Sequence, residues 1–112
     1  MINIEDRKLL RVGDTIYSWR SYRQGNTTLT ARSVYKTVIT RIDDDGRIWG
    51  SWNGNRESRL GDWRRCYLHH PKPHHSAYRW DRGNYDDDVK HAAEEAAASR
   101  AEWRERRKAV KP

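Results

Sequence analysis

Over residues 1–68, apolar and polar residues alternate with the two-residue period of β-strands. β-branched and aromatic residues fill runs at 15–22, 28–42 and 47–52, and a shorter run follows at 63–68. Gly25-Asn26 and Asp43-Asp44-Asp45-Gly46 predict turns, because Gly adopts positive φ without steric cost. The run 28–42 has apolar residues on both faces, which indicates a strand that bends between two sheets. Four or five short strands in about sixty residues favour a small closed or half-closed barrel.

From residue 87 onward, the pattern is that of an α-helix rich in Ala, Glu and Arg. Three aspartates at 86–88 predict its start, because carboxylates cap exposed N–H groups and favour the positive end of the helix dipole. A helix over 87–110 would be roughly 35 Å long at ~1.5 Å per residue, longer than such a barrel can cover. We therefore expect a barrel over 1–68, a His/Pro/Tyr-rich linker over 69–86, and a helix with a basic end over 87–112.

Two motifs lie at the start and centre of the β-rich part. One is Val12-Gly13-Asp14-Thr15-Ile16-Tyr17; the other is Val38, then Ile42-Asp43, then Gly46, Ile48 and Gly50. They resemble the hydrophobic-Gly-Asp entry and the central hairpin of small SH3-like barrels of the KOW and Tudor type, over residues 9–68. The resemblance implies a mainly β, α+β fold and a habit of binding nucleic acid or peptides. The mix of Trp, Arg and His in so short a chain also resembles small phage-encoded accessory proteins.

The composition narrows the class of protein. Among 112 residues there are six Trp and six Tyr but no Phe, so aromatic side chains must supply much of a small core. That size excludes a large enzyme scaffold, and no window has the ~18 apolar residues of a membrane span. The one cysteine, Cys66, cannot form an internal disulfide, which favours the reducing cytoplasm and a buried structural thiol. Lys and Arg number 23 against 16 Asp and Glu, a net charge of +7.

Arg and aromatic residues are interleaved along the predicted strands. Guanidinium groups bind phosphates, and flat aromatic rings stack on bases. If Ile16 and Ile48 are in the core, alternation turns Tyr17, Trp19 and Trp49 outward. The sequence thus predicts a non-enzymatic nucleic-acid-binding module, DNA or RNA, with a surface made of Tyr17, Trp19, Arg20, Arg23, Arg47, Trp49, Arg64 and Arg65. The alternative interpretation is that the Trp residues are the core and the Arg residues a solvated surface.

The C-terminal helix suggests a different function. An apolar stripe recurs at seven-residue spacing, and with Arg107 it forms a candidate partner-binding surface: Val89, Ala96, Trp103, Arg107 and Val110. The protein would then be a small inhibitor or regulator that docks on a larger protein with an acidic surface, through this helix or the barrel groove. A second copy of the chain is another candidate partner for the helix. The basic end, from Arg100 to Lys111, is a candidate phosphate-binding arm.

Cys66 and four histidines at 69, 70, 74 and 75 lie within ten residues, and zinc binds both residue types. Because Pro71 and Pro73 divide the histidines, we interpret the stretch as an exposed linker, and no metal or cofactor is expected. A third hypothesis is a metal-dependent nuclease that uses His70, Asn84 and His91. Against it, the same prolines break the strand hairpin that should carry the first His of such a site.

Overall fold

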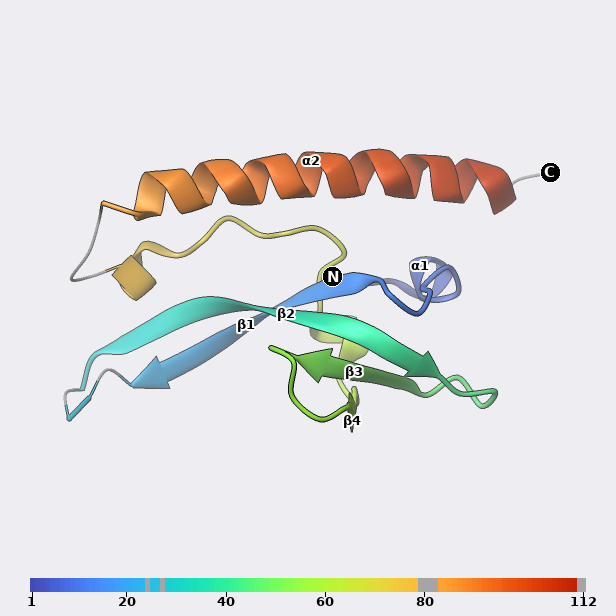
Figure 1. Ribbon diagram of the computed structural model, residues 1–112, viewed down its shortest axis with the longest axis horizontal. Helices are drawn as coiled ribbons and strands as arrows, with labels where there is room; N and C mark the ends of the chain where they lie inside the picture. Colours follow the sequence, from blue (N-terminus) through green and yellow to red (C-terminus); the bar gives the residue numbers. More distant parts are fainter. Residues whose placement is uncertain (24, 27, 79–82, 111–112) are drawn as a thin grey trace.

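The computed structural model describes residues 1–23, 25–26, 28–78 and 83–110, and its fold is mixed α+β (Figure 1). Four antiparallel strands form one sheet, and one long helix lies along it. In chain order, the elements are α1 (Ile4–Arg7), β1 (Thr15–Arg23), β2 (Thr30–Ile42), β3 (Ile48–Trp52), β4 (Ser58–Arg59), the 3₁₀ turns η1 (Trp63–Arg65) and η2 (His75–Tyr78), and α2 (Tyr85–Val110). Residues 79–82 of the expected linker and Lys111 of the expected basic end lie outside the described residues.

The long strand β2 is the centre of the sheet, whose strand order is β1-β2-β3-β4. It pairs with β1 from Thr15↔Val38 to Arg23↔Thr30, and its second half pairs with β3. A register shift between Ile39 and Arg41 marks a β-bulge, which bends a strand and increases its twist. The predicted bend is therefore a bulge within one sheet, and the expectation of two sheets is wrong.

The sheet is not closed into a barrel. Within the described part of the chain, the return to β1 is one isolated antiparallel bridge, Tyr17↔Tyr67. The strand expected at 63–68 is wrong, because residues 63–65 form the 3₁₀ turn η1. There the N–H of Arg65 donates to the carbonyl of Asp62 at 3.0 Å, and the N–H of Cys66 donates to that of Trp63 at 3.1 Å. These short-range bonds tighten the chain just before Tyr67.

The core lies between the sheet, the N-terminal segment and the end of α2. Ile16, Ile39 and Ile48 are the largest fully buried side chains, so the premise that Ile16 and Ile48 lie in the core holds. Other buried residues complete the cluster: Ile2, Leu10, Cys66, Leu68 and Trp103. Burial raises the pKa of the Cys66 thiol, consistent with the predicted structural role.

The helix α2 lies along one face of the sheet, and the chain from residue 69 to 78 runs between them (Figure 1). It begins at Tyr85, slightly before the predicted start, and the three aspartates lie in its first turn. Its far end is held by two arginines, because Arg106 binds Asp14 and Arg107 binds Asp6. No helix among the described residues combines the length and apolar character needed to cross a bilayer.

The short helix α1 was not predicted from the sequence. Its N-cap is Asn3, whose side-chain oxygen accepts the backbone N–H of Asp6 at 2.8 Å. The spacing of Asn3 and Asp6 is the signal that sequence reasoning could have used, because an Asx side chain just before a short acidic turn is a common helix start. The turn places Asp6 opposite the end of α2.

Candidate functional site

The structure separates the three aromatic residues that were expected to face outward. Tyr17 is only 4% exposed, so that expectation is wrong for it, because α2 and the linker cover the second face of the sheet. Burial and the nearby carboxylate of Glu95 raise its pKa to about 12. Trp49 is half-buried: its indole N–H donates to Asp43 Oδ2 at 2.9 Å, and the Arg41 guanidinium lies 4.3 Å from its ring centroid. Trp49 thus stabilises the turn after β2.

Trp19 is half-buried at the border between the two faces of the sheet. The Arg32 guanidinium lies 4.7 Å from the centroid of its ring, and the ring of His74 meets it edge-on at 6.5 Å between centroids. Trp19 also lines a cavity on the side of the sheet away from α2. Of the three predicted aromatic residues, Trp19 alone lines this cavity.

The five predicted arginines also lie in different places. Arg20 and Arg65 line the same cavity as Trp19. Arg23 is exposed at the end of β1, Arg47 pairs with Asp45, and the Arg64 guanidinium lies over the Trp63 ring. The structure therefore brings together Trp19, Arg20 and Arg65 and places the other predicted residues elsewhere.

Two adjoining cavities, of about 550 and 380 Å³, form a continuous groove on this side of the sheet. They share five lining residues: Ser18, Arg20, Thr37, Ser58 and Leu60. The larger cavity also contacts Arg59, Asp62 and Arg65, and the smaller one contacts Tyr35, Trp52 and Arg56. We call the two cavities together the Arg–aromatic groove.

The floor of the Arg–aromatic groove depends on Gly50, a buried residue of β3. A Cβ at this position would lie 2.6 Å from Thr37 Cγ2 and 3.0 Å from Leu60 Cδ1. Only glycine therefore lets β3 pack closely against both side chains. This close packing brings the end of β3 beside the middle of β2.

One wall of the groove is a ladder of three stacked side chains from three neighbouring strands. Tyr35 of β2 stacks on Trp52 of β3 with 4.5 Å between ring centroids and 14° between ring planes. From β1, the Arg20 guanidinium lies 5.6 Å from the centroid of the Tyr35 ring. Stacked rings and a guanidinium over a ring stabilise each other, so the ladder is a preformed aromatic surface.

The charge of the groove is strongly positive. Four arginines line it, namely Arg20, Arg56, Arg59 and Arg65, and Asp62 is the acidic lining residue. None of these four guanidinium groups forms an ion pair with a carboxylate of the described residues. Glu57, which lies nearby in sequence, instead accepts the Thr40 hydroxyl at 2.7 Å and pairs with Arg41. Unpaired guanidinium groups in a groove are available to bind anions.

Sequence reasoning missed four groove residues: Tyr35, Trp52, Arg56 and Arg59. Alternation placed Tyr35 on the face of Thr37 and Ile39, which was a usable signal. The segment 56–59 was given no role, although it carries two arginines within four positions. The meeting of Tyr35 with Trp52 depends on strand register, which the residue pattern does not state.

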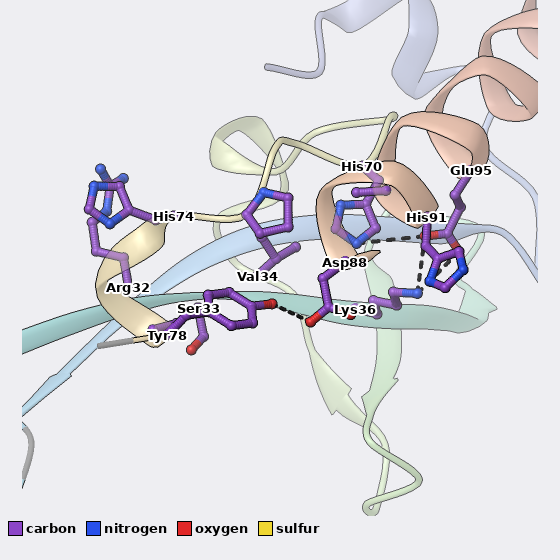
Figure 2. A pocket seen from close by; sticks show the side chains of 13 residues that line it. Arg32, Ser33, Val34, Lys36, His70, His74, Tyr78, Asp88, His91 and Glu95 are labelled. Carbon is purple, nitrogen blue, oxygen red and sulfur yellow. Dashed lines mark hydrogen bonds and ion pairs between the residues drawn. The ribbon is translucent and has the colours of Figure 1, made fainter. Parts of the chain in front are cut away.

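A third cavity, of about 340 Å³, lies on the opposite face between β2, the linker and α2 (Figure 2). Most of its charged groups contact one another, and Arg32 instead lies over the Trp19 ring. Glu95 binds Lys36 at 3.0 Å and lies 3.6 Å from His70 Nε2, and the Tyr78 hydroxyl donates to Asp88. These contacts tie α2 to the sheet, so we interpret this cavity as a structural junction.

The helix residues predicted to bind a partner are mostly used within the chain. Ala96 and Trp103 are 2% and 4% exposed, and Arg107 binds both carboxylate oxygens of Asp6 at 3.0 Å. Val89 is half-buried, and Val110 is exposed at the end of α2. The apolar stripe of α2 therefore packs against the sheet and the linker of the same chain. The linker runs along the helix, so together with the sheet it covers more of α2 than a barrel alone would.

The histidines of the linker do not form one cluster: His74 and His75 stack with 4.5 Å between ring centroids, whereas His69 lies against Ser99 of α2. Ser99 Oγ donates to the carbonyl of Leu68 at 3.1 Å, so it accepts the Nδ1–H of His69 at 2.8 Å. Burial, with Arg100 and Arg107 nearby, lowers the pKa of His69. Within the described ranges, no three His, Cys, Asp or Glu side chains are grouped so that they could hold a metal ion.

Comparison of this chain with protein-family models, with curated proteins and with solved structures returns no match. We therefore infer the function from the residues of the Arg–aromatic groove.

Proposed function

We propose that this protein is a non-enzymatic module that binds nucleic acid through the Arg–aromatic groove. The observation that carries the proposal is that four guanidinium groups, none of them in an ion pair with a carboxylate of the described residues, line one groove with the stacked rings of Tyr35 and Trp52. Phosphate contacts supply most of the affinity of such proteins, and aromatic rings receive bases. Trp19, Arg20 and Arg65 keep the nucleic-acid-binding role that the sequence predicts for them. To these we add Tyr35, Trp52, Arg56 and Arg59.

We also infer that the fold is a half-open form of the SH3-like barrel. The four-stranded meander, the 3₁₀ turn η1 after β4, and the return of Tyr67 to β1 support this inference. In this arrangement, the groove lies where the sheet has not closed. Because the sheet is open, a ligand can reach the side chains of Arg20 and Tyr35.

The proposal is tested by titrating a fluorescently labelled oligonucleotide with the protein at several salt concentrations. Four phosphate contacts predict that the logarithm of the affinity falls with the logarithm of salt with a slope of roughly −3. The double variant Arg56→Ala/Arg59→Ala should roughly halve that slope and weaken binding at low salt. Both side chains are exposed, so the variant should fold normally.

The matched control is Arg100→Ala/Arg104→Ala, which removes the same charge from the exposed surface of α2. It should leave both the affinity and the slope close to those of the parent protein. If the two double variants lose affinity equally, binding reflects net charge or the helix arm, and the groove is not the site. If the parent protein binds no oligonucleotide at low salt, the proposed function is wrong.

A further inference from the structure

We propose that the ligand of the Arg–aromatic groove is single-stranded, and that one of its bases extends the ladder by stacking on Trp52. This inference rests on the proposed function and specifies its substrate class. It distinguishes strands with accessible bases from duplexes, whose bases are already stacked on both sides.

The ladder ends at Trp52. Tyr35 comes from the central strand β2, Arg20 from β1 on one side of it, and Trp52 from β3 on the other. The ring of Trp52 is stacked on Tyr35, and the residue is 39% exposed. An indole that is stacked on a neighbour and also open to solvent is an incomplete stack, to which a further flat group can be added.

The contrast with Trp49, three residues earlier in the same strand, supports this assignment. Trp49 is half-buried under Arg41, and its indole N–H is bonded to Asp43. For Trp52, the described residues supply neither a guanidinium over the ring nor an acceptor for the N–H. Trp49 is therefore part of the fold, whereas Trp52 keeps its ring and its N–H available for a ligand.

The arginines lie where a bound strand would place its phosphates. Arg56 lines the smaller cavity together with Trp52, and Arg59 and Arg65 line the adjoining larger one. A strand with a base on Trp52 would thus follow the groove past Ser58 and Leu60 toward Arg65. This combination of a positive channel and a stacking ring at one end is the usual arrangement in proteins that bind single strands without strong sequence preference.

The test compares a short oligothymidylate with a duplex of equal length, using the parent protein, Trp52→Ala and the matched control Tyr22→Ala. Tyr22 is also an exposed aromatic residue, but it lines neither cavity. The single strand should bind more tightly than the duplex. Trp52→Ala should weaken single-strand binding by about 5- to 150-fold, the effect of losing one stacked base, and Tyr22→Ala should not.

A second measurement keeps the test decisive if Trp52→Ala does not fold. Oligothymidylate should quench part of the tryptophan fluorescence of the parent protein, and Trp52→Leu, which keeps an apolar side chain at the end of β3, should lose the share of the quenching that comes from Trp52 and keep at most that of Trp19. Equal affinity for duplex and single strand, or quenching that is undiminished in Trp52→Leu, overturns the inference. If binding still depends on Arg56 and Arg59 in that case, the proposed function stands without the stacking step; if it does not, both fail.

Discussion

Replacing Asp14 by Asn tests whether one buried ion pair holds α2 on the sheet. Asp14 Oδ2 lies 2.7 Å from Arg106 Nη1, and Oδ1 lies 3.0 Å from Nη2. The Arg106 side chain is only 5% exposed, and its guanidinium also lies 4.5 Å from the centroid of the Trp103 ring in the core. The hydrogen bonds to Asp14 are the main cause of the raised pKa of Arg106, so the charge is stabilised chiefly by this carboxylate.

The expected loss of stability follows from what remains around Arg106 in the variant. Removing one partner of a buried pair costs about 3–5 kcal/mol. Glu102 still accepts from Nη2 at 2.7 Å and the Leu9 carbonyl from Nη1 at 3.1 Å, which places the cost at the lower end of that range. We therefore expect Asp14→Asn to lower the free energy of unfolding by about 3 kcal/mol.

Urea unfolding followed by tryptophan fluorescence measures this loss. With a typical slope of ~2 kcal/mol per molar urea, the midpoint should fall by roughly 1.5 M. The matched control is Asp44→Asn in the exposed turn after β2, which should change stability by less than ~0.5 kcal/mol. A loss below ~1 kcal/mol in Asp14→Asn would refute the argument that this pair anchors the helix.

Three further predictions concern the core, the linker and the thiol. Gly50→Ala should lower the free energy of unfolding by about 1–3 kcal/mol in the same urea assay, because the new methyl group overlaps Thr37. A neutral effect would contradict the close packing of β3. The folded-state pKa of His69 is lowered, so its contribution to stability is complete above the unfolded-state pKa of ~6.5 and is lost as the pH falls from there through the lower folded-state pKa. Unfolding at pH 7.5 and 5.5 should show a smaller difference in His69→Gln than in the parent. Cys66 should react with a thiol reagent at pH 8 far more slowly in the native protein than in urea, and equal rates would show that the thiol is not protected.

The parts of the fold that could be predicted are those encoded by local pattern. The positions of β1, β2, β3 and α2 follow from alternation, turn residues and helix propensity. Tyr17 was placed incorrectly because alternation tells which residues share a face but not what covers that face. Its cover comes from α2 and the linker, more than fifty residues later in the chain. The resulting burial is a tertiary effect without a local signal.

The sequence indicated the kind of candidate site but not all of the residues that form it. The interleaving of Arg with aromatic residues indicated a binding surface, and three of the residues assigned to it, Trp19, Arg20 and Arg65, line one cavity. Which further residues join them depends on cross-strand register and on the path of residues 53–62. Tyr35 meets Trp52 because β2 pairs with β3 in a particular register, and a shift of one residue would have turned either ring to the other face.

The carboxylates are distributed unevenly between the two sides of the sheet. This explains how a chain with a net charge of +7 leaves guanidinium groups available to a ligand in one groove. On the α2 side of the sheet, Asp6, Asp14 and Glu95 each bind a cationic side chain and so neutralise it. In the Arg–aromatic groove, four guanidinium groups face one acidic lining residue, Asp62. The charges that stabilise the helix are therefore separate from the guanidinium groups that line the groove beside the aromatic ladder. Variants that weaken the helix anchor should consequently change stability before they change the salt dependence of binding, provided that the protein remains folded.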